Sequence, residues 1–290
     1  MKKRKDKKNR WLEDLVASKS ALLSAIFLLI IILIAVFAPL LTEQDPNHTD
    51  LRVRLRPPMP LEGASPEHVL GTDSVGRDVA ARLVYGARIS LMVGFIAVVI
   101  SGLIGVTLGL ITGYFGGWLD DVIMRLADIQ LAFPFILLML AVLAVVGPGL
   151  WNVIIVLGVT GWVSYSRIVR GCVMSLREKE FIEAARAIGV SNTRIIIKHL
   201  IPNIIGPVVV IASFSVSRTI IAEASLSFLG LGVDVETATW GKMLSEGREY
   251  ITDAWWLTTL PGIFLALTVL CINVFGDWLR DVVDPKTVKR

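Results

Sequence analysis

Two charged residues, Arg218 and Glu223, lie in or beside an otherwise apolar stretch of the sequence. Ionisable side chains at membrane depth usually serve a function, because burying them in hydrocarbon is costly. Arg218 could bind a carboxylate in a cavity or on a second protein chain. It could equally extend its side chain to the aqueous interface. Pairing with Glu223 is a further alternative, although residues five apart are off the i,i+4 register of a helix. Arg218 and Glu223 are therefore candidates to line a translocation pathway through the membrane. Asn273, in another apolar stretch, is a candidate for an interhelical hydrogen bond.

Residue patterns typical of an enzyme active site are absent from the sequence. It has no Gly-x4-Gly-Lys-Ser/Thr phosphate loop, no Gly-x-Ser-x-Gly turn and no His-Glu-x-x-His pair. The three histidines, His48, His68 and His199, have no liganding neighbour at helical spacing, and Cys172 and Cys271 are far apart in the sequence. We therefore expect no catalytic residues, no metal and no cofactor in this chain. Any ATP hydrolysis that drives it would need another protein.

The most informative segment is residues 180–203, which contain the run Glu183-Ala184-Ala185-Arg186. Residues 179–188 suit a short helix, and its small alanines allow close approach of a partner surface. Gly189 follows at the place where a helix commonly ends on a left-handed residue.

A second short helix is predicted after this glycine, over residues 193–200. Ser191 or Asn192 could cap its start, and Pro202 marks the entry to the next apolar stretch. One interpretation of this helix–glycine–helix loop is an amphipathic element that binds anionic lipid headgroups. The other is a docking surface for a partner protein.

These residues must be positioned by membrane-spanning helices. The chain of 290 residues is 54% apolar with a mean hydropathy of +0.68, and its apolar residues occur in long uncharged runs. Residues 21–41 are too long for the apolar core of a signal peptide, so we expect an uncleaved anchor. Six spans are predicted, over residues 21–41, 89–111, 129–146, 151–168, 204–222 and 255–275.

The orientation follows from lysines and arginines in the flanking segments. The tail 1–20 holds eight, the loop 167–203 holds seven and the tail 276–290 holds four. We therefore expect both termini and this loop in the cytoplasm. The segment 42–88 would be external, although it carries six arginines against seven acids. Residues 89–275 would form the core of five spans.

Two local patterns predict packing. Small residues recur every four positions along the second span, which indicates close approach of another helix. These residues are Ala97, Ser101, Gly105, Gly109 and Gly113. Before that span, an amphipathic helical stretch over 78–87 is predicted. Charged residues in and before this stretch are expected to form a surface ion-pair cluster: Asp73, Arg77, Asp78 and Arg82.

Spacing in the loop links the chain to a known family. Glu183-Ala184-Ala185, then Gly189, then Ile201-Pro202 resemble the EAA loop of ABC importer permeases, with His199 where that pattern has an aliphatic residue. Further blocks resemble the dipeptide/oligopeptide (peptide/nickel) permeases, and the likeness is greatest to the second of the two permease subunits. These blocks are residues 70–78, 85–91, 113–118, 223–232 and 276–281, with Asp284-Pro285.

The resemblance implies an all-α polytopic membrane protein with six spans, the fold of type I ABC importer permeases and both termini cytoplasmic. It implies a prokaryotic cytoplasmic membrane, a second homologous permease, two ATPase subunits that bind ATP and Mg, and an extracytoplasmic solute-binding protein. Nucleic acid is not an expected partner. The cargo would be short peptides, with nickel or glutathione as the alternative.

The resemblance also implies roles for residues of the loop. It assigns Glu183, Ala184, Ala185 and Gly189 to the ATPase-docking surface, with Arg186 nearby, and Pro202 to the exit into the fifth span. An ion-gradient-driven transporter is a further alternative, which paired charges along several spans would favour. An intramembrane enzyme would need a catalytic pair inside the spans.

Overall fold

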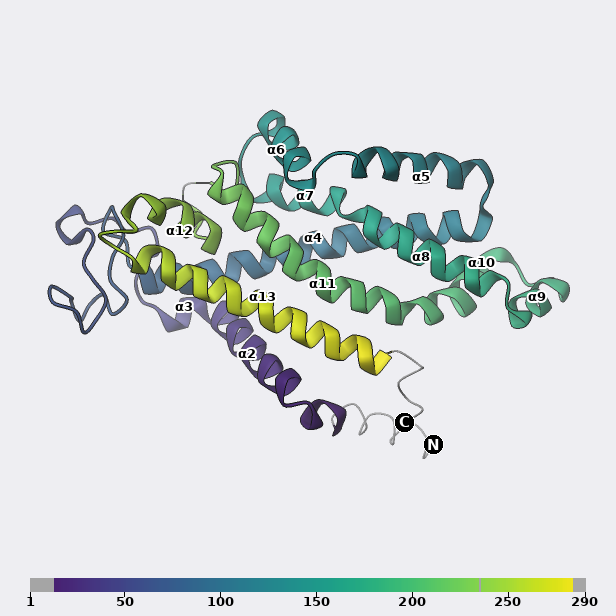
Figure 1. The fold of residues 1–290 in the computed structure, drawn as a ribbon, viewed down its shortest axis with the longest axis horizontal. Helices are drawn as coiled ribbons and strands as arrows, with labels where there is room; N and C mark the ends of the chain where they lie inside the picture. The colour runs from purple at the N-terminus through teal and green to yellow at the C-terminus, as the bar shows by residue number, and fades with distance from the viewer. Residues whose placement is uncertain (1–12, 235, 284–290) are drawn as a thin grey trace.

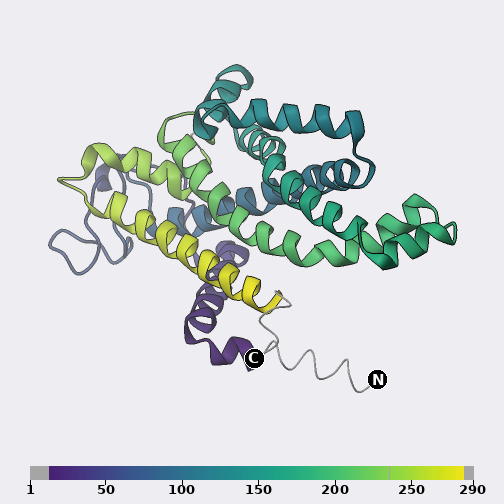
Figure 2. The ribbon, with the colours of Figure 1, turned by 45° about the vertical axis from the view of Figure 1, so that its right-hand side comes forward.

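A computed structural model describes residues 13–234 and 236–283, and in these residues the fold is built from helices, with only two isolated β-bridges. Residues 1–12 and 284–290 of the predicted tails lie outside this part, whereas residues 276–283 of the predicted C-terminal tail continue α13. Figures 1 and 2 show long helices that run in roughly the same direction through the molecule. The elements are α2 (Lys19–Val36), α3 (Ala38–Leu41), η1 (Leu51–Val53), α4 (Val79–Phe115), α5 (Gly117–Leu131), α6 (Phe135–Val146), α7 (Leu150–Thr160), α8 (Trp162–Arg177), α9 (Glu180–Ala187), α10 (Asn192–Ile195), η2 (Ile196–Leu200), α11 (Ile201–Phe228), α12 (Trp240–Gly247), η3 (Arg248–Tyr250) and α13 (Trp256–Val283).

Five helical stretches in the described residues are long and apolar enough to cross a membrane. Two of them, α2 and α13, are single helices near the ends of the chain. Leu150–Arg177 joins α7 and α8, and Asn192–Phe228 joins α10, η2 and α11. The fifth, α4, has 37 residues and is therefore about 55 Å long, more than a hydrocarbon core of about 30 Å requires.

The third predicted span, residues 129–146, is not one straight helix. Helices α5 and α6 meet at a bend of 92°. Pro134 stands at the N-cap of α6; it has no backbone N–H, and its ring disfavours a helical conformation at the residue before it. The count of six spans therefore holds when α5 and α6 are taken together as one broken span.

The small-residue stripe of α4 packs against α7 and α8, which confirms the predicted close approach of a helix. A Cβ atom on Gly105 would lie 2.4 Å from the carbonyl oxygen of Trp162, and one on Gly109 would lie 2.7 Å from that of Ser166. Ser101 Oγ donates a hydrogen bond to the carbonyl oxygen of Gly158 at 2.7 Å. Larger side chains at these positions would push α4 away from α7 and α8.

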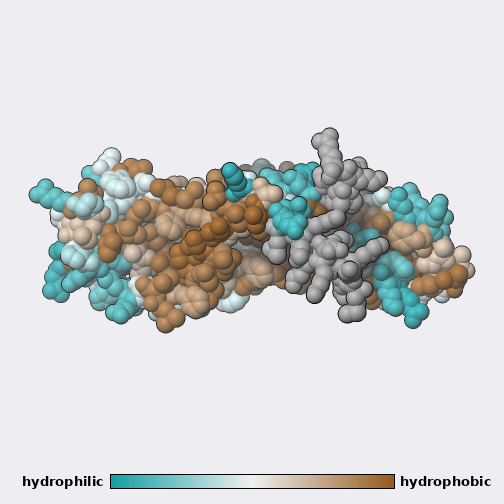
Figure 3. Space-filling view, turned by 90° about the horizontal axis from the view of Figure 1, so that it is seen from below, coloured by the Kyte–Doolittle hydropathy of each residue, from teal (hydrophilic) through white to brown (hydrophobic). Residues whose placement is uncertain are grey.

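The two ends of the molecule differ in structure. Residues 42–78 and α12 lie at one end, and α9 lies at the other (Figure 1). The start of α2 and the end of α13 both point away from the end that holds residues 42–78 (Figures 1 and 2). On the face that carries α2 and α13, a broad apolar area adjoins this polar end (Figure 3). That pattern is typical of a protein that contacts lipid along its length.

Candidate functional site

Helix α9 carries the Glu-Ala-Ala run, and glycine ends the loop helix as predicted. Gly189 has a φ of +77°, and its N–H bonds the carbonyl oxygen of Arg186 at 3.0 Å. The N–H of Val190 then reaches the carbonyl oxygen of Ala185 at 3.0 Å. These two bonds satisfy carbonyl groups that would otherwise be free at the end of the helix. The chain therefore reverses sharply here, and α9 ends as a projecting tip.

One face of α9 is fixed to the protein and the other is open. Ile182 is fully buried, and Ala185 is 7% exposed in the same apolar cluster as Leu200. Glu183, Ala184 and Arg186 are exposed. Ala185 was predicted to lie on a docking surface, but in the structure it packs against the protein's own core. Its small side chain instead lets α9 pack closely on that core.

The open face of α9 carries large apolar side chains. Ile188, at the tip, is 81% exposed, and Phe181 is 45% exposed. An apolar side chain at the end of a projecting loop costs free energy when water surrounds it. This face therefore has the composition of a surface that another protein covers.

Tyr114, near the C-terminal end of α4, connects the loop to the long helices. It is 5% exposed, and its hydroxyl donates to Asn192 Oδ1 at 2.7 Å. The guanidinium of Arg186 lies 5.1 Å from the centre of its ring, within the range of a cation–π contact. Arg177 donates to its carbonyl oxygen at 3.2 Å. Tyr114 therefore joins α4, α8, α9 and α10.

The sequence alone did not single out Tyr114 for this role. It appears only within the block 113–118 that resembles the permease family. The tyrosine follows Gly113, the last glycine of the small-residue stripe, which places it where α4 meets the loop. That position is the signal that could have identified it.

The second predicted loop helix is continuous with the fifth span. Ser191 occupies the N-cap position of α10 without a side-chain hydrogen bond, and Asn192 instead accepts from Tyr114. A π-helical stretch, Ile196–Leu200, then precedes Pro202, which has no N–H to give to a preceding carbonyl group. Asn203 Nδ2 donates to the carbonyl oxygen of His199 at 2.6 Å. The wider turn precedes the proline, and the helix continues through it without a break.

Arg218 and Glu223 are not paired in the structure. Glu223 is fully buried, and its Oε1 accepts from Ser227 Oγ at 2.8 Å, with the hydroxyl groups of Ser90 and Thr239 nearby. Arg218 is exposed on another side of α11. Glu223 therefore lies on the side of α11 that packs against the start of α12. Asn273 confirms its predicted interhelical bond, because its Oδ1 accepts from Ser217 Oγ at 2.7 Å.

The predicted surface ion-pair cluster exists, but it is buried. Arg82 is 1% exposed and Arg77 is 8% exposed. Both donate to the same oxygen of Glu246 in α12 at 2.8 Å, and Arg77 also bonds Asp73 at 2.6 Å. Asp78 lies outside this set, because it caps α4 through Ala81 N.

The cluster is buried because α12, far along the sequence, packs over it. The stretch 78–87 was predicted as an amphipathic helix of its own, before the second span. From Val79 onward it forms the first turns of α4 rather than a separate helix.

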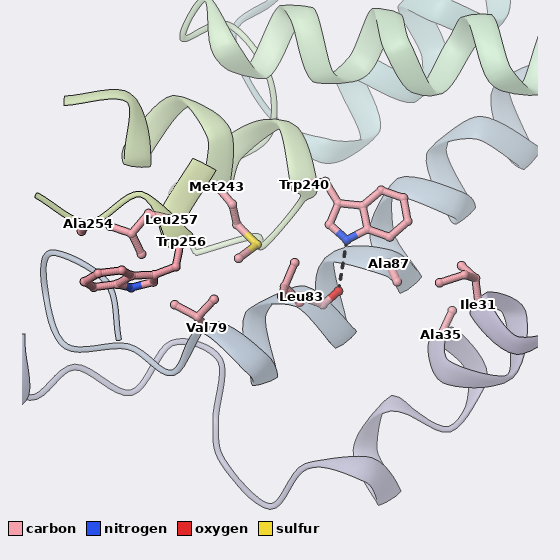
Figure 4. Close-up of a cluster of buried hydrophobic side chains, with 10 residues drawn as sticks. All are labelled: Ile31, Ala35, Val79, Leu83, Ala87, Trp240, Met243, Ala254, Trp256 and Leu257. Atoms are coloured by element: carbon pink, nitrogen blue, oxygen red, sulfur yellow. Dashed lines mark hydrogen bonds between the residues drawn. The ribbon is translucent and has the colours of Figure 1, made fainter. Parts of the chain in front are cut away.

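Helix α12 is anchored by a tryptophan and by glycines. The indole of Trp240 is fully buried and donates to the carbonyl oxygen of Leu83 at 3.2 Å (Figure 4). A Cβ atom on Gly241 would lie 2.4 Å from Ala224 Cα, and one on Gly247 would lie 2.8 Å from Leu257 Cβ. Helices α4, α11 and α13 therefore hold α12 from three directions.

Comparison with known sequences gives consistent matches. The family described as binding-protein-dependent transport system inner membrane component matches residues 105–289. The family described as N-terminal TM domain of oligopeptide transport permease C matches residues 10–58.

Individual relatives match nearly the whole chain. The dipeptide transport system permease protein DppC of Alkalihalophilus pseudofirmus is 46% identical over 94% of this chain and 88% of its own. The di/tripeptide transport system permease protein DppC of Pseudomonas aeruginosa is 42% identical over 93% and 89%. The oligopeptide transport system permease protein OppC of Bacillus subtilis is 40% identical over 94% and 88%.

A solved structure has the same fold. The MetNI methionine ABC transporter, in inward-facing conformations, aligns with a TM-score of 0.57 over 70% of this chain and 96% of the matched chain. The two sequences are 22% identical, so this likeness concerns the fold alone.

Proposed function

Because the chain belongs to the binding-protein-dependent transport system inner membrane component family, as a permease of the dipeptide and oligopeptide type, we propose that it forms half of the membrane pathway of an ATP-driven importer of short peptides. The relatives that carry this proposal are named as dipeptide and oligopeptide permeases and match over nine-tenths of the chain. The other half of the pathway is a second, homologous permease.

The proposed location is the cytoplasmic membrane of a prokaryote, with α9 and both termini on the cytoplasmic side. Seven lysines and arginines in the loop 167–203 and eight in the first twenty residues support this orientation. The end formed by residues 42–78 and α12 then faces outward, where an extracytoplasmic solute-binding protein delivers the cargo.

Two ATPase subunits supply the energy, because the sequence has no phosphate loop of its own. ATP and Mg bind in those subunits, and this chain needs no cofactor. One ATPase docks on the open face of α9, where Phe181, Glu183, Ala184 and Ile188 are exposed. Approach of the two ATPases would drag the docked helices together, and rigid-body rocking would change which side of the pathway is open.

The buried face of α9 makes this coupling mechanically possible. Ile182 and Ala185 pack in one cluster with residues of α4, α8 and α11, and Tyr114 adds polar bonds between the same helices. Close-packed protein interiors transmit a displacement rather than absorb it. The single observation that carries the coupling role is this helix with one face packed on the protein and the other face exposed.

Glu183→Lys and Gly189→Pro test the coupling in the reconstituted complex. The lysine reverses a charge on the open face, and the proline cannot adopt the positive φ of residue 189. We expect normal membrane insertion, ATP hydrolysis that no longer responds to peptide-loaded binding protein, and at least about tenfold lower peptide uptake. Glu13→Lys, at an exposed acid that precedes α2 and lies outside the loop, is the matched control.

Each outcome has a distinct meaning. Normal coupling in both variants would contradict docking through α9. Peptide uptake by the wild-type complex without ATP would contradict an ATP-driven importer.

A further inference from the structure

Arg218 is a charged side chain on a face of α11 that this chain leaves uncovered. Helix α11 packs against α4, α8, α12 and α13, yet the guanidinium of Arg218 remains exposed. In the described part of the chain, no acidic side chain pairs with it. The only acid within α11, Glu223, lies five residues further on and therefore about 140° around the helix. It is fully buried and bonded to Ser227.

The position of Arg218 along α11 excludes a simple helix-end location. Ten residues separate it from Phe228, the last residue of the helix, which corresponds to about 15 Å of axial rise. That distance exceeds the length of an extended arginine side chain. Ile221, which is 45% exposed, lies between Arg218 and this end. A lone guanidinium at this depth is unfavourable against lipid, so its face should meet water or a polar ligand.

The guanidinium of Arg218 is suited to a ligand that carries a carboxylate. Its planar fork binds a carboxylate through two parallel hydrogen bonds and stays charged at every physiological pH. A transporter of varied peptides has to contact groups that all of them share, and the C-terminal carboxylate is one. Phe214 and Ile221, one helical turn to either side, supply apolar contacts for the rest of a small ligand.

We propose that Arg218 binds the C-terminal carboxylate of the peptide as it passes between this chain and the second permease. The inference rests on the proposed function and names a cargo contact within it. A single exposed contact suits a pathway, since binding must be strong enough to admit the cargo and weak enough to release it. Glu223, in contrast, is assigned to the packing of α12 and not to the pathway.

Uptake of a radiolabelled dipeptide into proteoliposomes tests the proposal, with the full complex and peptide-loaded binding protein. Arg218→Gln should lower uptake about tenfold, while the second permease still co-purifies and the binding protein still stimulates ATP hydrolysis. Arg218→Lys should retain an intermediate rate, because it keeps the charge but loses the fork. Arg88→Gln, which removes an exposed arginine from α4, is the matched control and should transport normally.

A dipeptide with a C-terminal amide identifies the group that Arg218 binds. After correction for the binding protein's measured affinity for each peptide, the amide should be taken up about tenfold more slowly than the acid by the wild type. In Arg218→Gln the two should differ by less than about twofold, because the interaction is already lost.

Three results would overturn the proposal. Unchanged uptake by Arg218→Gln would mean that the side chain has no role in the pathway. Loss of the second permease on purification would mean that Arg218 pairs with an acid of that subunit. An unchanged preference for the acid over the amide in the variant would place the carboxylate contact elsewhere. Failure of the wild type to take up any peptide would instead contradict the proposed function itself.

Discussion

The two ends of this permease are held in opposite ways. One end is formed by residues 42–78 and α12, and it is called the outer end because the proposed orientation directs it outward. There α12 is enclosed by its own chain, through buried arginines that bond Glu246, the buried indole of Trp240 and backbone contacts at Gly241. At the other end, α9 is attached by one face only, and Ile188 at its tip is 81% exposed. The contrast teaches that the outer end is completed within this chain, whereas the loop end leaves an open apolar face, which is where we propose that the ATPase docks.

Removal of the shared carboxylate should have the largest effect on stability. Glu246→Ala would leave Arg82, which is 1% exposed, with only the carboxylate of Asp73 at 3.8 Å. Because an uncompensated buried charge is strongly unfavourable, we expect a loss of about 3–5 kcal/mol, measured as a lower thermal unfolding midpoint in detergent.

The double variant Arg82→Met with Glu246→Leu sharpens this test. It removes both charges, so it should be less destabilised than Glu246→Ala. Glu249→Ala, an exposed acid in η3, is the control and should unfold like the wild type. A Glu246→Ala protein as stable as the control would show that the outer end is not fixed by its charges.

A substitution at the junction between α4 and the loop should lower stability by a smaller amount. Tyr114→Phe removes the hydroxyl bond to Asn192 but keeps the ring beside Arg186. We expect about 1 kcal/mol of lost stability, since one neutral hydrogen bond is removed, and a lower ratio of peptide transported to ATP hydrolysed.

Tyr85→Phe provides the comparison, because the hydroxyl of Tyr85 forms no hydrogen bond within the described residues. An equal transport ratio in the two variants would exclude a coupling role for Tyr114.

The smallest change in stability is expected at the tip of the loop. Ile188→Ser should alter the free energy of unfolding by no more than about 0.5 kcal/mol, because the side chain is already exposed. It should nevertheless weaken ATPase binding several-fold in a pull-down titration.

The same substitution at the outer end makes the comparison direct. Ile251 is 60% exposed, and Ile251→Ser should leave ATPase binding unchanged. Equal ATPase binding by both variants would mean that the apolar tip of α9 is not part of the docking surface.

Patterns that repeat locally were readable from the sequence. The four-residue spacing that ends in Gly109 and Gly113 predicted a close helix contact, and Gly189 predicted the end of α9. Each depends on a few neighbouring residues and on steric rules that hold in any fold. The identity of the partner helix was not readable, because a row of small residues says that something approaches but not what.

Features that join distant parts of the chain were missed for a physical reason. Glu246 meets Arg82 across 164 residues, and no local pattern encodes that pairing. The bend near Pro134 was encoded locally, but the apolar run around it was read as one span by its hydropathy alone. Ala185 could not be assigned to the inner face of α9 until the cluster beneath that helix was known.

Helix α4 connects the two ends of the molecule as one continuous helix. Arg82 stands near one end of this unbroken rod and Tyr114 near the other, 32 residues apart and so separated by about 48 Å of rise. A tilt of only about 5° around one end would displace the other by about 4 Å, close to the axial rise of three residues. In the proposed orientation, a small tilt where α4 meets the loop would therefore move the end near Arg82 by several ångströms.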